Sequence, residues 1–315
     1  MTLLPGVTRY LNIIETSLKN SRFEFFRRFL IIITSSSLFI AMSGCFKTYF
    51  SFSLYCTPQA YPLIFTTFLV IYSVYGLNKI TDIKEDRLNN PDRTNLILRN
   101  KKLFKYSTGI TYFLAVIIGC FYGWKVLLII LFPLMVGIIY SIKIHPRIPR
   151  LKDIFPVKSM IVALSWTVGN TFLPIVDGKI NFLIMVLIFY FFFIKSFINT
   201  VLFDLMDFKG DKKIGTRTIP VVMGPSRTVL LLLVLNTTLS ILILISISCG
   251  FFQPLMLPLI FCLIYCYIYI IYFYKVKNRL RMEIFVDGEW ILLGFISLLT
   301  IHYHLIPCKL GLPLQ

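Results

Sequence analysis

The chain has 315 residues, of which 57% are hydrophobic, 16% are aromatic and only 15% are charged. These proportions lie well outside those of an average soluble domain. The length would suit a two-domain soluble enzyme, but apolar runs recur at nearly regular intervals, and most approach the roughly 20 residues that cross a bilayer. The composition therefore predicts an all-α integral membrane protein.

Nine apolar runs predict membrane-spanning helices. They cover residues 29–45, 56–78, 104–122, 124–142, 156–175, 180–203, 228–250, 254–274 and 287–306. Residues 1–26, which precede them, fit either an amphipathic helix on the cytoplasmic face or a solvated leader. In runs one to four, and again in runs five to eight, the second helix ends in an acidic motif that a basic loop follows. This repeated plan predicts a single domain of residues 1–315, with two four-helix halves and a ninth helix around a central cavity.

The formal net charge of +18 would suit a nucleic-acid binder, so the position of the charges decides its meaning. Most of the 32 lysines and arginines precede the first span or lie in every second loop; the exceptions are Lys47, Lys125, Lys179, Lys195 and Lys309. Because basic loops mark the cytoplasmic side, the N-terminus is predicted to be cytoplasmic and the C-terminus outside. The charge thus indicates topology and contact with anionic lipid, and we expect no nucleic-acid partner.

Cysteine usage adds one expectation. The chain has seven cysteines, scattered mainly through apolar segments. No two of them have Cys-x-x-Cys spacing. We therefore expect small apolar side chains, and neither disulfides nor metal ligands.

The first acidic motif follows the second predicted span. Asn78, Asp82 and Asp86 are spaced so that, on a continuing helix, their side chains drift by only about 40° per step and line one face. Carboxylates stacked in this way near a membrane repel one another unless cations lie between them, and oxygen ligands favour Mg²⁺. The alternative is a solvated acidic helix end that offsets neighbouring lysines. The polar loop that follows contains Arg93 and could act as a lid or a second phosphate clamp.

The second acidic motif closes the sixth predicted span. Asp204, Asp207 and Asp211 again have helical spacing, at the same depth and on the same side of the membrane. Lys195 and Asn199 lie deeper in this span, where an ionisable residue indicates a function. Two acidic helix ends surrounded by basic loops suit a diphosphate held through bridging Mg²⁺ ions, which would stabilise it as a leaving group. An apolar cavity would accept a hydrocarbon tail.

This constellation resembles the UbiA superfamily of intramembrane prenyltransferases. The resemblance rests on the two acidic motifs, on Tyr140-x-x-Lys143, on the nine spans and on the stretch from Gly210-Asp211 to Thr218-Ile219-Pro220. It implies that Lys143 and Arg147 lie near the phosphates and that Tyr140 belongs to the same pocket. It also implies a set of ligands for Mg²⁺ and the prenyl diphosphate: Asn78, Asp82, Asp86, Asp204, Asp207 and Asp211. The chain begins its first motif with Asn78-Lys79, where many relatives have Asn-Asp.

We therefore predict a Mg²⁺-dependent prenyltransferase that ionises an isoprenyl diphosphate and passes the allylic cation to a lipophilic acceptor. The expected catalytic residues are Asp82, Asp86, Asp207, Asp211, Lys143 and Tyr140. The expected substrate-binding residues are Asn78, Arg93, Arg147, Lys195, Asn199 and Asp204. The favoured acceptor is an aromatic ring of a quinone-like molecule, and a glycerol ether or a porphyrin is the alternative, since the superfamily uses all three.

Two other hypotheses differ in what happens to the cation or in whether a reaction occurs at all. A terpene cyclase of the same superfamily would capture the allylic cation within its own chain. A membrane ion or lipid transporter would use the acidic motifs as an ion site. The transporter is disfavoured because the motifs lie near one membrane face, whereas transporter sites usually lie near the midplane.

Overall fold

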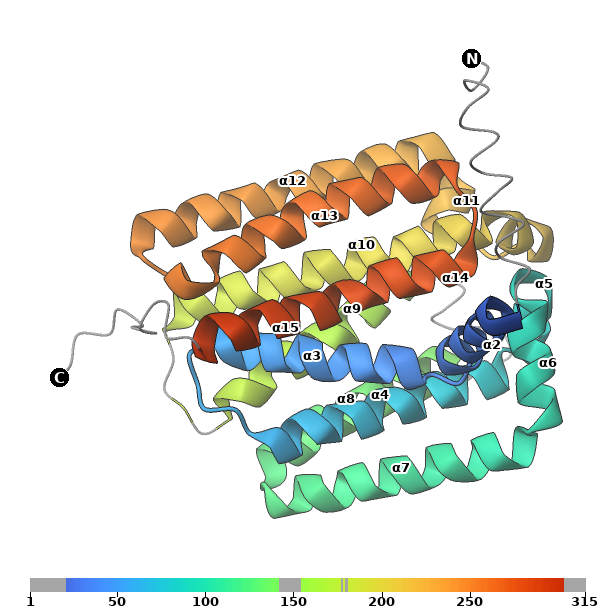
Figure 1. Ribbon diagram of the computed structural model, residues 1–315, viewed down its shortest axis with the longest axis horizontal. Coiled ribbons are helices and arrows are strands. Elements are labelled where there is room, and N and C mark those ends of the chain that lie inside the picture. The colour runs from blue at the N-terminus through green and yellow to red at the C-terminus, as the bar shows by residue number, and fades with distance from the viewer. Residues whose placement is uncertain (1–20, 142–153, 177, 179–180, 303–315) are drawn as a thin grey trace.

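The computed structural model describes residues 21–141, 154–176, 178 and 181–302, and this part of the chain is a bundle of helices without a strand (Figure 1). The predicted all-α class is therefore confirmed. The main helices of the bundle are α3 (Leu38–Leu54), α4 (Tyr61–Thr81), α7 (Lys101–Phe121), α8 (Trp124–Ser141), α9 (Val157–Phe172), α10 (Phe182–Ile214), α12 (Pro225–Cys249), α13 (Met256–Lys275) and α15 (Gly288–His302). The other elements are α2 (Ser21–Ser35), α5 (Ile83–Asn89), α6 (Pro91–Arg99), α11 (Ile219–Met223), α14 (Arg279–Met282), the 3₁₀ turns η2 (Leu173–Ile175) and η3 (Gln253–Leu255), and the π-helical turn η4 (Glu283–Asp287).

Within the described residues, five helices are long and apolar enough to cross a membrane: α4, α7, α10, α12 and the continuous segment of η3 and α13. The bent pair of α2 and α3 makes a sixth if it is taken as one span. Each of the nine predicted ranges overlaps a helix. However, α9 has only 16 residues, fewer than the roughly 20 that cross a bilayer, and α15 is described only as far as His302. The count of nine spans stays a prediction.

The first predicted span, residues 29–45, is wrong as a single straight helix. Its two helices, α2 and α3, meet at an angle of 67°, and Ser37 at the junction has a left-handed backbone with φ of 73°. Beyond this break α3 continues to Leu54, so Lys47 lies inside the helix and is buried, although the charge pattern assigned it to the outer side. The predicted amphipathic segment 1–26 lies mostly outside the described residues.

The helices pack as a closed ring. α3 packs against α4, α4 against α7 and α8, α8 against α9, and α9 against α10; α12, α13 and α15 follow in order, and α15 returns to α3 (Figure 1). One buried apolar cluster is centred on α10, α12, α13 and α15, and a second lies between α3, α4, α7 and α8. The last helix therefore closes the bundle against the first.

The short helices α2, α5, α6, α11 and α14 gather at one end of the bundle (Figure 1). The C-terminal turns of α10 reach the same end, since this helix has 33 residues and is about 50 Å long against a hydrocarbon thickness of about 30 Å. The predicted helical spacing of Asp204, Asp207 and Asp211 is confirmed, because all three belong to α10.

The first motif departs from the expected continuous helix. α4 ends at Thr81 and α5 begins at Ile83, and Asp82 between them has φ of −98° and ψ of 20°. The expectation that one unbroken helix carries Asn78, Asp82 and Asp86 is therefore wrong at Asp82.

The cysteines depart from expectation at one position. Cys56, which lies between α3 and α4, is disulfide-bonded. The prediction that no cysteine forms a disulfide is therefore wrong. The cysteines described as free are Cys45, Cys120, Cys249, Cys262 and Cys266.

The packing of α4 on α7 depends on the absence of a side chain at Gly76. A Cβ atom there would lie 2.2 Å from Cγ2 of Thr108, and Thr108 is held in place because its Oγ1 donates to the carbonyl oxygen of Phe104 at 2.9 Å. We expect Gly76→Ala to lower the free energy of unfolding by about 1–3 kcal/mol, measured by thermal unfolding in detergent. Gly109→Ala on α7 is the control, since nothing lies within 4 Å of its Cβ position. An equal fall in the free energy of unfolding in both variants would contradict this account.

Candidate active site

A polar cavity of about 240 Å³ opens among α3, α4, α6, α9, α10, α14, η4 and α15. Its walls carry charges of both signs from segments that are far apart in the sequence. The charged lining residues are Lys47, Lys79, Arg93, Lys158, Asp204, Asp207, Arg279, Glu283 and Asp287. Such a mixture is costly to bury, so the contacts of each charge determine what the cavity can bind.

An ion-pair network connects the two acidic motifs. Arg93 donates from Nη2 to Oδ1 of Asp86 at 2.7 Å, and its Nη1 lies 3.9 Å from Oε1 of Glu283. Arg279 donates from Nε to Oε1 of Glu283 at 3.2 Å and from Nη1 to Asp207. Burial of Arg279 would lower the pKa of its guanidinium, but the nearby carboxylates of Asp207, Glu283 and Asp86 raise this pKa above its ordinary value. The network therefore stays charged and joins α5, α6, α10 and α14.

The two ends of the second motif are held by different neighbours. Asp204 accepts hydrogen bonds from Nζ of Lys158 at 2.7 Å and from Oγ of Ser159 at 3.0 Å. Asp211 accepts one at Oδ1 from Nδ2 of Asn89 at 3.3 Å. The helices α5 and α10 meet here because Gly210 has no side chain: a Cβ atom at this position would lie 1.8 Å from Oδ1 of Asn89. This contact brings α5, which follows the first motif, against the second motif.

The predicted site residues are distributed around this cavity. Four of them line it: Arg93, Asn199, Asp204 and Asp207. Two contact the walls of the cavity: Asp86 on α5 pairs with Arg93, and Asp211 lies at the α5–α10 contact. Asp82 lies at the α4–α5 junction. Asn78 lines a second, apolar cavity. The side chain of Tyr140, and all of Lys143 and Arg147, lie outside what the structure describes.

Lys195 lines neither cavity. Its buried ammonium donates to Oε1 of Glu289 at 2.8 Å and to the hydroxyl of Tyr269 at 2.9 Å. An ammonium has no acceptor, so the Tyr269 oxygen accepts from Lys195 and directs its own hydrogen to Oδ1 of Asn199, 2.9 Å away. Asn199 itself lines the polar cavity. Lys195 is thus connected to the polar cavity through Tyr269 and Asn199.

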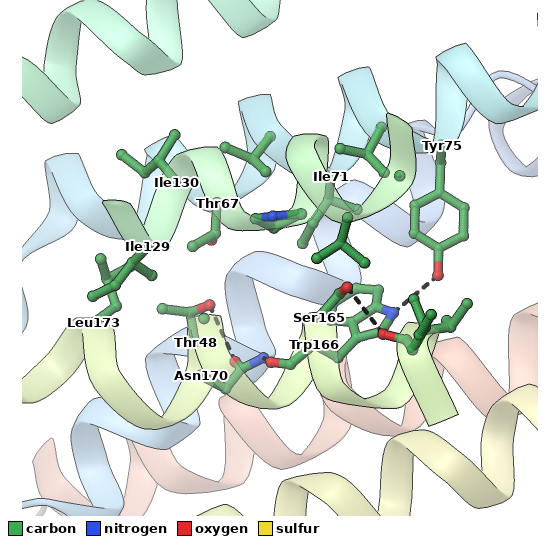
Figure 2. A pocket seen from close by; sticks show the side chains of 18 of the residues that line it. Thr48, Thr67, Ile71, Tyr75, Ile129, Ile130, Ser165, Trp166, Asn170 and Leu173 are labelled. Carbon is green, nitrogen blue, oxygen red and sulfur yellow. Dashed lines mark hydrogen bonds between the residues drawn. The ribbon is translucent and has the colours of Figure 1, made fainter. Parts of the chain in front are cut away.

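The apolar cavity, of about 160 Å³, lies between α4, α8 and α9. Ile71, Ile129 and Leu173 are among its lining residues (Figure 2). Tyr75, Val162 and Trp166 line both cavities. At this shared wall, Nε1 of Trp166 donates to the hydroxyl of Tyr75 at 2.9 Å, as Figure 2 shows. The two cavities together fit a ligand with a charged head and an apolar tail.

Two lysines of the polar cavity form no ion pair with a described carboxylate. Nζ of Lys79 donates to the carbonyl oxygens of Thr34 and Ser35 at 3.2 and 2.9 Å, so it caps the end of α2 at the break before α3. Nζ of Lys47 donates to Oγ of Ser196 at 2.7 Å. It also lies 4.6 and 4.3 Å from the ring centroids of Trp166 and Trp290, within range of cation–π interactions.

Sequence reasoning missed part of the lining. Arg279 was counted only as a positive loop charge, and Glu283 and Asp287 were not considered, although their spacing of four residues repeats the spacing of Asp82 and Asp86. Lys47 could have been recognised from the sequence as an isolated lysine in an apolar stretch. The contact of Lys79 with α2 could not, because it depends on the break at Ser37.

The motif residues fit a Mg²⁺ ion in their donor chemistry, since every side-chain donor they offer is oxygen. Oδ2 of Asp211 is buried and has no hydrogen-bond partner, so it is an acceptor that a cation would satisfy. Among the described residues, no three Asp, Glu, His or Cys side chains are grouped closely enough to hold an ion. Asp86, Asp204 and Asp207 instead pair with basic side chains. Metal binding would require these carboxylates to exchange partners.

Comparison with known proteins gives a family match over most of the chain. Residues 30–299 match the profile of the UbiA prenyltransferase family. A digeranylgeranylglyceryl phosphate synthase from Pyrococcus horikoshii is 26% identical over 169 residues, which is 51% of this chain and 57% of that protein. A second protein of that name, from Methanococcoides burtonii, is 29% identical over 188 residues, 57% of this chain and 60% of its own length. The matches thus span less than two thirds of either relative.

Solved structures have the same fold. A digeranylgeranylglyceryl phosphate synthase aligns with a TM-score of 0.54 at 20% identity, over 86% of this chain and 94% of the other. A UbiA homolog from Archaeoglobus fulgidus, bound to GPP and Mg²⁺, aligns with a TM-score of 0.60 at 16% identity, over 85% and 98%. The apo UbiA homolog from Aeropyrum pernix K1 gives 0.60 at 12% identity, over 84% and 98%.

The buried pair of Lys195 and Glu289 yields a stability prediction. Both side chains are fully buried, and removing one partner of such a pair leaves an uncompensated charge. We expect Glu289→Ala to lower the free energy of unfolding by about 3–5 kcal/mol, measured by denaturation in detergent.

The double variant Lys195→Met with Glu289→Leu leaves no uncompensated charge. We therefore expect its free energy of unfolding to fall less than that of Glu289→Ala. Glu24→Ala is the control, because its pair with Arg28 is exposed and contributes no more than about 1 kcal/mol. Equal destabilisation of the Glu289→Ala and double variants would show that the uncompensated charge is not the cause.

Proposed function

Because the chain belongs to the UbiA prenyltransferase family, we propose that it transfers an isoprenyl group from a prenyl diphosphate to a lipophilic acceptor. The observation that carries this proposal is the junction of a charged cavity and an apolar one at Tyr75 and Trp166. The diphosphate would occupy the first cavity and the isoprenyl tail the second. The homologs from Archaeoglobus fulgidus, bound to GPP or DMAPP with Mg²⁺, support this class of donor.

The basic side chains of the polar cavity would hold the diphosphate. Arg93, Lys158 and Arg279 pair with carboxylates in this structure, and each can instead donate to phosphate oxygens in charge-assisted hydrogen bonds. As the allylic C–O bond breaks, both of its electrons stay on the diphosphate. Cations fixed around the leaving group therefore stabilise the transition state more than the ground state.

We propose that Mg²⁺ binds between the two acidic motifs, with ligands drawn from Asn78, Asp82, Asp86, Asp204, Asp207 and Asp211. When bound, it would neutralise the motif carboxylates and the charge that develops on the diphosphate. Lys143 and Arg147 remain proposed phosphate ligands, and Tyr140 a proposed neighbour of them. The rings of Tyr75 and Trp166 lie at the boundary where the allylic cation would form, and aromatic faces stabilise cations.

For the acceptor, we place a glyceryl ether phosphate ahead of the aromatic ring that the sequence favoured. Two curated relatives are named digeranylgeranylglyceryl phosphate synthase. The cavity also supplies charge for an anionic acceptor, because Lys47 and Lys79 line it without a carboxylate partner in the described part of the chain. No observation favours a porphyrin acceptor or cyclisation.

We further propose that the end of the bundle with α2, α5, α6 and α14 faces the cytoplasm. The described basic segments that were predicted to be cytoplasmic, those around α5, α6, α11 and α14, belong to this end (Figure 1). The disulfide-bonded Cys56 precedes α4, whereas α5 follows it, so the two lie at opposite ends of that helix. Disulfides persist in oxidising compartments, which supports an outward-facing position for Cys56.

The function is tested in membranes that contain the protein, supplied with a prenyl diphosphate and either a glyceryl ether phosphate or a quinone-type phenol. We expect Mg²⁺-dependent diphosphate release and a prenylated product, identified by mass spectrometry. Asp82→Ala and Asp207→Asn should each lower the rate about 100-fold or more, since each removes a carboxylate proposed to bind the Mg²⁺ that would neutralise the leaving group. Glu24→Gln, at an exposed pair on α2, is the control. Undiminished turnover in both motif variants, or full turnover in EDTA, would refute the assignment.

Donor length should depend on the apolar cavity. Gly169 lines it, and nothing lies within 4 Å of its Cβ position, so Gly169→Leu would fill part of the space. We expect kcat/KM for a twenty-carbon donor to fall about 10-fold or more, while that for a five-carbon donor changes little, because steric exclusion of a few methylenes is worth this much. Gly109→Leu, outside both cavities, is the control. An equal fall in kcat/KM for the long and the short donor would show that the isoprenyl tail does not bind in this cavity.

A further inference from the structure

We propose that Asp287 is a further catalytic residue, the base that takes the proton from the acceptor as the new bond forms. The inference rests on the proposed function and deepens it, because prenyl transfer to a hydroxyl or to an aromatic ring must release a proton. Neither acidic motif includes Asp287.

The first observation is the unpaired state of this carboxylate. Four carboxylates line the described polar cavity: Asp204, Asp207, Glu283 and Asp287. The first three form ion pairs with Lys158, Arg279 or both arginines of the network. The side chain of Asp287 makes no ion pair or hydrogen bond with any described residue. It is therefore the carboxylate of this lining that is available to accept a proton without breaking an existing contact.

The second observation is depth. Glu283 and Asp287 are the two ends of the π-helical turn η4, so Asp287 lies about one helical turn further along the chain toward α15. Glu283 belongs to the ion network beside the proposed diphosphate site. The reacting carbon of a prenyl diphosphate is the first atom beyond the diphosphate. A base one turn beyond the network is thus placed for an acceptor that approaches this carbon.

The third observation is the chemistry of the surrounding walls. Lys47 of α3 and Lys79 of α4 line the same cavity and act electrostatically on Asp287. They would attract the phosphate of a glyceryl ether acceptor, and their charges oppose the larger effect of burial, which raises the pKa of the Asp287 carboxyl above its ordinary value. The titratable groups that face Asp287 from the packed elements are Lys47, Tyr75, Lys79, Arg279 and Glu283.

The backbone around Asp287 is also fixed. Oγ of Ser43 on α3 donates to the carbonyl oxygen of Asp287, and Trp290, one turn later, is buried in the same wall. The turn is therefore anchored while its carboxylate stays unengaged. A base held in this way loses little freedom when the acceptor arrives, which favours proton transfer in the transition state.

The proposed step balances. The bond between the allylic carbon and the diphosphate oxygen breaks, and its electron pair leaves with the diphosphate. A lone pair of the acceptor hydroxyl forms the new C–O bond, and the hydroxyl proton moves to a carboxylate oxygen of Asp287. With an aromatic acceptor, the ring carbon forms a C–C bond and loses its proton to the same carboxylate. The proton later leaves to water.

The other polar groups of the cavity are worse candidates. Asp204, Asp207 and Glu283 would lose charge-assisted hydrogen bonds on protonation. The Tyr75 hydroxyl already accepts a hydrogen bond from Trp166. Lys47 and Lys79 would attract an anionic acceptor only as ammonium ions, and an ammonium ion cannot accept a proton. Asp287 alone among the described lining carboxylates combines a side chain without an ion pair or hydrogen bond to a described residue and a fixed backbone.

The test compares ionisation with transfer in the full-length protein in membranes, with Mg²⁺, a prenyl diphosphate and a glyceryl ether phosphate. We expect Asp287→Asn to lower formation of the transferred product about 100-fold or more, the usual contribution of a general base. Diphosphate release without acceptor, with prenyl alcohol as the product, should stay within about threefold of the wild type, because the groups that hold the leaving group are unchanged.

Two further variants separate a base from a structural role. Asp287→Glu should regain part of the transfer rate, and formate should restore transfer in Asp287→Ala by replacing the missing carboxylate. In the wild type, transfer should fall as the pH drops and the base becomes protonated, whereas the residual rate of Asp287→Asn should lack this acidic limb. Glu24→Gln again serves as the control.

The inference is overturned if Asp287→Asn transfers at the wild-type rate with the same pH profile. It is also overturned if ionisation and transfer fall together and formate rescues neither, since Asp287 would then act only on the charge balance of the cavity. Failure of the proposed function has a different signature: the wild-type protein itself would form no prenylated product with either acceptor.

Discussion

Burying charge inside an apolar helical bundle is the constraint on which this structure depends. A charged side chain removed from water must find a partner or the bundle is destabilised. Lys195 does so with Glu289, Lys158 with Asp204, and Arg279 with Asp207. The pairs of Lys195 and Arg279 connect elements 94 and 72 positions apart, and the pair of Lys158 connects the neighbouring helices α9 and α10. The polar contacts therefore fix which helices adjoin one another around the cavity, while apolar contacts supply most of the packing.

The same pairs explain how one cavity can be stable without ligands and still bind a polyanion with a metal ion. Carboxylates and basic groups satisfy one another in the present arrangement, and a diphosphate and Mg²⁺ offer each side a new partner of the same charge as the old one. Exchange of partners then changes the net charge of the cavity little. Three charged groups take no part in this exchange, because Lys47, Lys79 and Asp287 form no ion pair with any residue that the structure describes. These are the groups we associate with the acceptor.

Closure of the helical ring brings the proposed donor and acceptor groups together. Because α15 returns to α3, the turn that precedes α15 lies against the first helices of the bundle. Arg279 and Glu283 thereby reach the acidic motifs, and Asp287 reaches Lys47 and Lys79. The break between α2 and α3 contributes as well, since it exposes the carbonyl oxygens that Lys79 caps. A basic residue after Asn78 is thus accounted for by local packing in this chain.

The sequence by itself determined the helical class, the approximate ranges of the main helices, the two acidic motifs and the family resemblance, because these depend on hydropathy, spacing and residue type along the chain. It did not determine the break at Ser37, the burial of Lys47 or the interruption at Asp82. Nor did it identify Arg279, Glu283 and Asp287 as cavity residues. Arg279 and Asp207 are separated by 72 positions, and no local pattern records such a contact. Only the tertiary structure decided which charges meet, because the cost of burial is settled by partners that the folded bundle supplies.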